Sequence, residues 1–296
     1  MSAVVNPSVL ALVATYSPGS NLLALVGALS SQGIPVLVSD DASPCTADQV
    51  LRDCGLVSGV TVIRHDHNKG IARGLNEGLR RARDSGCSWL LTSDQDSRFP
   101  DTYVDEISAF AQSMGSLWEE SVRVGAVGAG IVVNAGGSLK YPITHVAGAS
   151  GPIEVTEEVI ASGTLWNVSA LLEVGGFDES LGLDAVDAAA CLRLREAGYR
   201  IVVAPELRME HELGDSRSVQ LLGRTVLATG HSGERRATMM RNRLKLAPAE
   251  FKQSPKHAFR TLRRVGVNAF MGATVEGDRW EKIKGSVKGL RGKGTV

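Results

Sequence analysis

No apolar run in the sequence approaches the 18 residues that a membrane-spanning helix needs. The opening residues, Met1-Ser-Ala-Val-Val, lack the basic segment of a signal peptide. These absences predict a chain without a spanning helix or a cleaved leader. We therefore expect a cytoplasmic protein.

Cysteine is scarce, and neither sign of charge is in excess. The four cysteines show no Cys-x-x-Cys pair and no metal-ligand spacing, which favours reduced thiols over disulfides or a zinc site. The 32 Lys and Arg balance the 32 Asp and Glu, so the chain has no overall attraction for nucleic acid. Its 296 residues are enough for one large α/β domain with an extension.

A glycine-rich phosphate loop is also missing after the first apolar run, where Tyr16-Ser-Pro-Gly19 stands instead. This absence argues against a Rossmann dehydrogenase and against a nucleotidyltransferase. Apolar runs nevertheless alternate with segments of helical spacing, which predicts an α/β fold whose central sheet is mainly parallel and flanked by helices. The predicted strands are Val9–Thr15, Val36–Val38, Val60–Ile63, Trp89–Ser93, Val124–Val133, Ile153–Ser162 and Tyr199–Ala204, with Asn134–Pro152 as a loop or irregular hairpin. The predicted helices are Leu22–Leu29, Ala47–Cys54, Ile71–Leu79, Tyr103–Met114, Ser169–Val174 and Ala188–Ala197.

Two carboxylates, Asp94 and Asp96, directly follow the apolar run Trp89–Ser93. Open α/β sheets bind ligands at the carboxyl ends of their strands, and on extended backbone these two side chains would face the same way. Hard oxygen donors suit Mg²⁺ or Mn²⁺, which would hold a diphosphate. A plain turn is the alternative, because Asp, Ser and Pro are common loop residues.

Four further polar residues stand out, each with a structural alternative. Asp40 ends the second predicted strand, and Arg73 lies near the start of a helix, where it could meet a phosphate or simply be exposed. Asp187 stands at a predicted helix N-cap, where the helix dipole should favour its ionised form and lower its pKa. His211 could be a metal ligand or an ordinary structural histidine.

The chain becomes basic after Arg235. Between Arg241 and Val296, Lys and Arg outnumber Asp and Glu by about ten, and Phe251–Met271 reads as one or two basic amphipathic helices. This segment could bind the inner leaflet of a membrane or pack on the body of the protein. The last stretch, Lys282–Lys293, mixes glycine with lysine, which predicts a flexible tail.

In this order, the motifs resemble a family 2 glycosyltransferase of the GT-A fold, in particular the rhamnosyltransferase-like members that build surface polysaccharides. The resemblance covers roughly Val9 to Leu246. It predicts a catalytic domain over residues 1–246 and a basic helical extension with a tail over residues 247–296. The motifs that carry it are Thr15-Tyr16, Ser39-Asp40-Asp41, Asn68-x-Gly70, Asp94-Gln-Asp96, Gly175-Gly-Phe-Asp178, Asp187 with Cys191-Leu-Arg193, His211 and Arg241-Asn242.

The resemblance implies an inverting, metal-dependent transfer from a nucleotide sugar to a glycan or lipid-linked glycan. dTDP-rhamnose is one candidate donor, and a homo-oligomer is possible. A divalent cation, Mg²⁺ or Mn²⁺, would stabilise the leaving diphosphate, and one carboxylate would deprotonate the acceptor. The resemblance assigns Thr15, Tyr16, Asp40, Arg73, Asp94 and Gly163 to the donor; Asp94, Asp96 and His211 to the metal; Ser162, Thr164 and Asp184 to the acceptor side; and Asp187 to the base.

Two departures from the family pattern leave alternatives open. Val186 precedes Asp187 where many relatives carry an acidic residue, and Ala188–Ala190 follow it where related rhamnosyltransferases often carry bulkier or acidic residues. The same fold could use another donor, such as a UDP-hexose or UDP-galactofuranose. It could also belong to a sugar-nucleotide binding protein that has lost catalysis.

Overall fold

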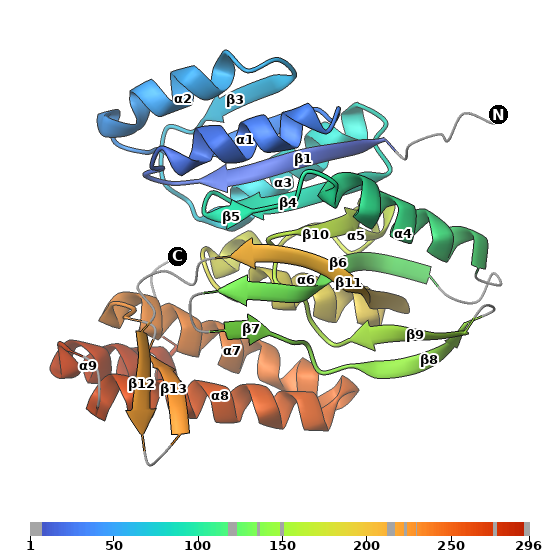
Figure 1. Ribbon diagram of the computed structural model, residues 1–296. Coiled ribbons are helices and arrows are strands. Elements are labelled where there is room, and N and C mark those ends of the chain that lie inside the picture. Colours follow the sequence, from blue (N-terminus) through green and yellow to red (C-terminus); the bar gives the residue numbers. More distant parts are fainter. Residues whose placement is uncertain are drawn as a thin grey trace.

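The computed structural model describes residues 8–117, 123–134, 137–148, 151–211, 217–221, 224–228, 230–274 and 277–292. Its centre is a mixed sheet in the order β3-β2-β1-β4-β10-β6-β11-β9-β8 (Figure 1). The long strands are parallel in two blocks, β3-β2-β1-β4 and β6-β11, and β10 runs antiparallel between them. The predicted α/β fold with a mainly parallel central sheet is confirmed. The strands that form the two parallel blocks and their link are β1 (Val9–Thr15), β2 (Val36–Asp40), β3 (Val60–Arg64), β4 (Trp89–Asp94), β6 (Arg123–Asn134), β10 (Thr164–Asn167) and β11 (Tyr199–His211).

Helices cover both faces of this sheet because the central strands are apolar on both sides. Every residue of β1 is buried, and alternate residues point to opposite layers. Val13 belongs to the core cluster that includes residues of α1, α2 and α4, whereas Leu12 belongs to the cluster that includes residues of α3, α5 and α6. These helices are α1 (Asn21–Ser31), α2 (Asp48–Gly55), α3 (Ile71–Asp84), α4 (Tyr103–Leu117), α5 (Val168–Glu173) and α6 (Val186–Glu196).

Glycines in α3 allow this helix to pack closely on the sheet. A Cβ on Gly78 would lie 2.7 Å from a methyl of Leu12, and a Cβ on Gly74 would lie 3.0 Å from Ser39 Oγ. The helix therefore lies closer to β1 and β2 than side chains at these positions would permit.

The segment Asn134–Pro152, predicted as a loop or irregular hairpin, contains two described strands, β7 (Gly137–Leu139) and β8 (Thr144–Gly148), and β8 forms a hairpin with β9 (Gly151–Thr156). Two predicted strand boundaries are wrong. β9 ends at Thr156, so Ser162 lies in a loop. β11 continues past Ala204 to His211, because its second half pairs with β6 and with the short strand β5 (Ser97–Arg98).

Three helices form the carboxyl-terminal part, beside a hairpin of β12 (Arg217–Leu221) and β13 (Arg224–Ala228) (Figure 1). The helices are α7 (Gly233–Gln253), α8 (Pro255–Thr274) and α9 (Arg279–Leu290), and each packs against the other two. The predicted boundary between residues 246 and 247 therefore falls inside α7. No helix among the described residues is both long and apolar enough to span a bilayer.

The prediction of a flexible tail from Lys282 is wrong as far as Leu290, because this stretch forms most of α9. A Cβ on Gly289 would lie 2.5 Å from the carbonyl oxygen of Ala237, and one on Gly285 would overlap that of Gly233. Two glycines four residues apart thus let α9 touch the backbone of α7. In the sequence the same glycines suggest flexibility.

Candidate functional site

The site residues gather where the parallel strands end. Asp40 ends β2, Asp94 ends β4 and His211 ends β11. Strand β5 follows Asp96 and pairs with the end of β11, with Ser97 opposite His211. This short pairing brings the Asp94–Asp96 segment to the histidine, although 114 residues separate Ser97 from His211.

Asp94, Asp96 and His211 form a cluster whose potential ligand atoms all lie within 4.8 Å of one another. His211 Nε2 is 3.8 Å from Asp94 Oδ2, and His211 Nδ1 is 3.5 Å from Asp96 Oδ1. Asp96 Oδ1 is buried and has no hydrogen-bond partner in the described structure. A buried carboxylate oxygen without a partner is costly, so this donor set fits a divalent cation.

The electrostatics of Asp94 agree with such a cluster. Burial raises the pKa of its carboxyl, and the negative charge of Asp96 raises it further, whereas His211 and Arg235 oppose the rise. The two carboxylates approach each other through a turn between β4 and β5, and the extended backbone assumed from the sequence is not what brings them together.

Gln95, between the two aspartates, was missed by the sequence reasoning. Its side-chain oxygen accepts the backbone N–H of Tyr16 at 3.0 Å and the hydroxyl of Thr15, and its amide donates to the Tyr16 carbonyl at 3.2 Å. Gln95 therefore joins the end of β1 to the cluster of Asp94, Asp96 and His211. The ring of Tyr16 is left half exposed, whereas Thr15 is buried.

The predicted donor-binding residue Asp40 is fully buried. Its carboxylate accepts the backbone N–H of Ser43 at 3.1 Å and lies 3.2 Å from Arg64 Nε. Asp41, next to it, accepts the backbone N–H groups of Lys69 and Gly70 at 2.9 and 2.8 Å. Asp40 thus fixes the loop after β2, and Asp41 fixes the loop that leads into α3.

Arg73 lies in the first turn of α3 and is half buried. Within the part of the chain that the structure describes, its side chain forms no hydrogen bond or ion pair. Its guanidinium is therefore available to a ligand.

Asp187 is the second residue of α6, so its predicted N-cap position is wrong. Ala185 occupies the N-cap with a left-handed φ of 61°, a conformation that the sequence does not reveal. Asp187 Oδ1 accepts the backbone N–H of Ala188 at 2.8 Å, and Oδ2 accepts that of Ala161 at 3.2 Å.

The pKa of Asp187 is raised to about 6, which corrects the expected lowering. Burial is the largest cause and outweighs both the Ala188 N–H bond and the opposing charge of Arg243, while Glu158 adds to the rise. The nearby carboxyl of Asp184 also has a raised pKa, mainly because of burial.

The loop of residues 161–164 connects the two groups of carboxylates. Ala161 donates to Asp187, and the hydroxyl of the next residue, Ser162, accepts the backbone N–H of Asp94 at 3.1 Å. Gly163 donates its N–H to the carbonyl of Thr92 at 2.8 Å. One short loop therefore sets the position of Asp187 relative to Asp94.

The side chains of this loop point inward. Ser162 and Thr164 are buried, and the Thr164 hydroxyl donates to the Ile160 carbonyl at 2.7 Å. Gly163 has a φ of 72°, and its carbonyl accepts the Tyr103 hydroxyl at 2.5 Å. The structure thus places Ser162 and Thr164 beneath the site, where they position its backbone.

Helix α7 supplies site residues that the sequence reasoning did not assign. Asn242 is fully buried and donates to the carbonyls of Leu181 and Asp184 at 2.8 and 2.7 Å, which fixes the loop before α6. Arg243 Nη1 lies 2.8 Å from Glu158 Oε2. In the sequence, only the place of Arg241-Asn242 after His211 in the order of motifs indicated that this helix contributes to the site.

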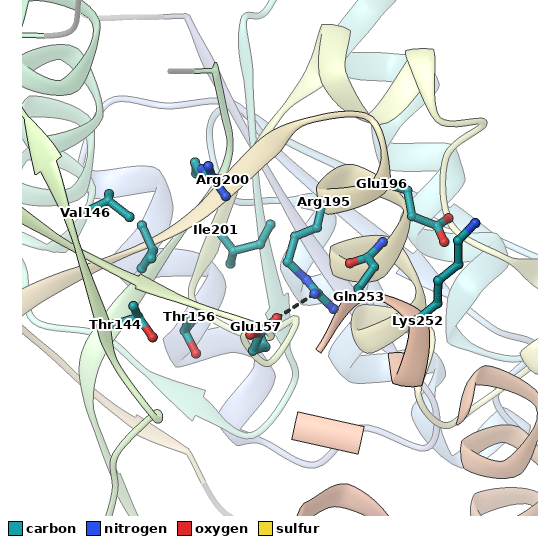
Figure 2. Close-up of a pocket in the computed structure, with 11 residues that line it drawn as sticks. Thr144, Val146, Thr156, Glu157, Arg195, Glu196, Arg200, Ile201, Lys252 and Gln253 are labelled. Atoms are coloured by element: carbon teal, nitrogen blue, oxygen red, sulfur yellow. Dashed lines mark hydrogen bonds and ion pairs between the residues drawn. The ribbon is translucent and has the colours of Figure 1, made fainter. Parts of the chain in front are cut away.

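The cavity in Figure 2, of about 670 Å³, lies elsewhere. It is bordered by β8, β9 and β11 and by the ends of α6 and α7, and an ion pair of 2.5 Å joins its residues Arg195 and Glu157. None of the predicted site residues lines it. The candidate site is therefore the open edge at the strand ends.

Comparisons with known proteins agree with this architecture. Residues 11–115 match the family model described as Glycosyl transferase family 2. Over 248 residues the chain is 29% identical to the dTDP-rhamnosyl transferase RfbF of Shigella flexneri. The aligned region covers 80% of this chain and 79% of that protein.

Solved glycosyltransferases have the same fold. The mannosyltransferase PcManGT from Pyrobaculum calidifontis, in complex with GDP-Man and Mn²⁺, superposes with a TM-score of 0.56 at 15% identity, over 97% of this chain and 88% of that one. S. aureus TarS 1-349, in complex with UDP-GlcNAc, superposes with a TM-score of 0.59 at 16% identity, over 96% and 81%. At these identities the likeness concerns the fold alone.

Proposed function

We propose that this chain, which is a rhamnosyltransferase-like glycosyltransferase of family 2, transfers rhamnose from dTDP-rhamnose to a hydroxyl of a glycan or lipid-linked glycan. Similarity to a dTDP-rhamnosyl transferase over 80% of the chain supports this donor. The acceptor is the one implied by the resemblance of the motifs to enzymes that build surface polysaccharides. The observation that carries the proposal is the cluster of Asp94, Asp96 and His211 at the carboxyl edge of the sheet.

Asp94, Asp96 and His211 would hold a divalent cation in this proposal. Such an ion would offset the negative charge that develops on the leaving nucleoside diphosphate. The buried Oδ1 of Asp96, which accepts no hydrogen bond from the described residues, supports the assignment, because an ion would satisfy it. The structural neighbour with GDP-Man also contains Mn²⁺.

Asp187 would act as the general base. A carboxyl with a pKa of about 6 is mostly ionised at neutral pH and is still basic enough to accept a proton. As the acceptor oxygen bonds to the anomeric carbon, its proton passes to Asp187, and the bond from that carbon to the diphosphate oxygen breaks. One displacement of this kind inverts the configuration at the anomeric carbon.

Arg235 and Arg73 would bind the donor. Arg235 is exposed in the first turn of α7, and its charge acts on both Asp94 and Asp184. It therefore lies in the electrostatic range of the metal cluster and of the acceptor side, where a diphosphate would lie. Arg73 has no partner among the described residues, so the nucleotide could recruit its guanidinium.

The alternative of an impaired binding protein rested on Ala188–Ala190. These alanines of α6 are buried in the hydrophobic core, so their difference from the family pattern does not change the surface of the site. The other alternative, a different donor, is tested directly by a thermal-shift screen of dTDP-, UDP- and GDP-sugars with Mn²⁺. A ligand at 100 times its dissociation constant stabilises the fold by about 2.7 kcal/mol.

The transfer itself is tested by incubating the donor found in that screen with a synthetic glycan acceptor and determining the anomeric configuration of the product by NMR. Rhamnose transferred from dTDP-rhamnose with inversion is the expected result. Stabilisation by a UDP- or GDP-sugar alone would reassign the donor. Binding without turnover in the presence of Mn²⁺ and acceptor would favour a binding protein.

A further inference from the structure

Helix α8 exposes a stripe that combines aromatic and basic side chains. Phe259 is 67% exposed, Val267 44% and Phe270 56%. Arg260 and Arg263 are exposed between them, and these positions recur at helical spacing on one face. Apolar side chains of this size, repeated along one exposed face, indicate an interaction surface.

The charge of this face has one sign. The whole of α8, Pro255–Thr274, contains no Asp or Glu. Within the described part of the chain, Lys256, Arg260 and Arg263 form no ion pair. Their charges are therefore not needed for the fold and are available to an anionic partner.

The opposite face of α8 makes the packing contacts. His257, Ala258, Thr261 and Met271 are buried, and the carbonyl of Asn268 accepts a hydrogen bond from Arg236 of α7 at 2.6 Å. The sequence left open whether the basic phenylalanine segment packs on the body or meets a membrane. In the structure one face of α8 packs on the body of the protein, and the outer face is left for a partner.

Helix α9, which lies next to α8, also exposes large apolar and basic side chains. Trp280 is 75% exposed and Leu290 61%, and Lys284 and Lys288 are exposed between them. Aromatic side chains and long basic side chains are the residues that anchor a protein at the interface of a bilayer. Figure 1 shows α8 and α9 together on the side of the molecule away from β1 to β3.

We propose that the outer face of α8, with Lys256, Phe259, Arg260, Arg263 and Phe270, docks on an anionic lipid bilayer. Charge complementarity selects this occupant, because a bilayer with anionic lipids offers both negative headgroups and an apolar interior. A second copy of the chain is disfavoured, because a two-fold interface through this face would bring the same arginines together.

The docking face lies close to the acceptor side of the site. Arg264, on the flank of α8, is 2.9 Å from Glu158 Oε1, and Glu158 in turn raises the pKa of Asp187. A helix is about 10–12 Å thick, so a lipid-linked glycan in the bilayer would begin about one helix diameter from these residues. This role in acceptor delivery rests on the proposed transfer, whereas the docking itself does not.

The test is co-sedimentation of the full chain with vesicles of phosphatidylcholine, alone or mixed with phosphatidylglycerol. We expect binding only to the anionic vesicles, with a loss of binding at high salt. The double variant Arg260→Glu with Arg263→Glu should bind at least about thirtyfold more weakly, since each basic residue near such a surface contributes about fivefold. Phe259→Ser with Phe270→Ser should also weaken binding.

The matched control is Arg81→Glu with Arg83→Glu, which makes the same charge change on exposed residues of α3. It should bind like the wild type. No binding to anionic vesicles, or equal loss in both charge-reversal variants, would overturn the proposal. A dimer in sedimentation velocity that the α8 variants abolish, without vesicle binding, would assign the face to a second copy.

The assay contains neither donor nor acceptor, so its outcome is independent of the transfer reaction. Transfer to a soluble glycan fragment should be unchanged in the α8 variants, because none of these residues touches the site. Loss of vesicle binding with intact soluble transfer would identify a docking surface. Absence of transfer with intact vesicle binding would instead refute the proposed function.

Discussion

Arg243 of α7 lies 2.8 Å from the carboxylate of Glu158 in the loop after β9, and both side chains are largely buried. The arginine also faces the carboxyls of Asp184 and Asp187, whose negative charges stabilise its own positive charge. Arg264 and His257 of α8 approach Glu158 as well, at 2.9 and 3.7 Å. The carboxyl-terminal helices are therefore electrostatically connected to the proposed base.

Arg243→Gln should move the acid limb of the pH–rate profile to higher pH. The positive charge of Arg243 opposes the raised pKa of Asp187, so its removal allows that pKa to rise above about 6. Breaking a buried ion pair should also lower the free energy of unfolding by about 3 kcal/mol. Transfer rates between pH 5 and 8, compared with those of Arg260→Gln, check the shift, and an unchanged limb would contradict it.

Asp187 should make the protein less stable as the pH rises. Its pKa is about 6 in the folded state and 3.8 in the reference state, so the folded state binds the proton more tightly. The resulting stabilisation is complete below about pH 4 and is lost as the pH passes 6, a change of about 3 kcal/mol.

This pH dependence is measurable by urea unfolding at pH 4.5 and 7.5. From pH 4.5 to pH 7.5 the wild type should lose free energy of unfolding through Asp187. The variant Asp187→Asn should not show this loss, because the amide does not titrate. Equal differences in the two proteins would show that the Asp187 pKa is not raised.

Asp96→Asn should abolish the effect of Mn²⁺ on donor binding. The amide offers a weaker ligand than the carboxylate, so the cluster of Asp94 and His211 loses one charged donor. Titration of Mn²⁺ by calorimetry, without donor, gives a readout separate from activity. Asp101→Asn, at an exposed position in the loop before α4, is the matched control. The same Mn²⁺ affinity in both variants and the wild type, or donor affinity insensitive to EDTA, would count against the metal assignment.

Gly163→Ala should destabilise the protein by about 2–4 kcal/mol. The residue has a φ of 72°, and a Cβ there would overlap Met209 Sδ and lie 2.8 Å from the Tyr103 hydroxyl. Gly27→Ala, inside α1 with open space around its Cα, should instead stabilise by about 0.5–1 kcal/mol. Chemical denaturation of the pair checks the sign of each change, and equal effects would refute this account of the loop.

The sheet was predictable because its central strands are unbroken apolar runs, as in Val9–Thr15. The carboxylates at the strand ends, Asp40 and Asp94, were predictable for the same reason, since they directly follow such runs. Local patterns of this kind determine local structure, and a parallel sheet brings its carboxyl ends together.

What the sequence did not reveal depends on distant contacts. The extension of β11 to His211 requires its pairing with β5, and the position of Asp187 requires a left-handed Ala185. Asn242 reaches the loop before α6 across 58 residues, which no local pattern encodes. The glycines of α9 suggest flexibility in the sequence, but in the structure they lie in a helix that packs against the backbone of α7.

The central claim is that Asp187 takes the proton of the acceptor while the metal cluster holds the donor. Its most direct test is the rate of transfer from dTDP-rhamnose by the wild type, Asp187→Asn and Asp184→Asn, with donor affinity measured in parallel. We expect Asp187→Asn to lose several orders of magnitude in transfer rate, roughly the contribution of a general base, with donor affinity near that of the wild type. If Asp187→Asn keeps most of its transfer rate while Asp184→Asn loses it, the base is Asp184 and the account is wrong.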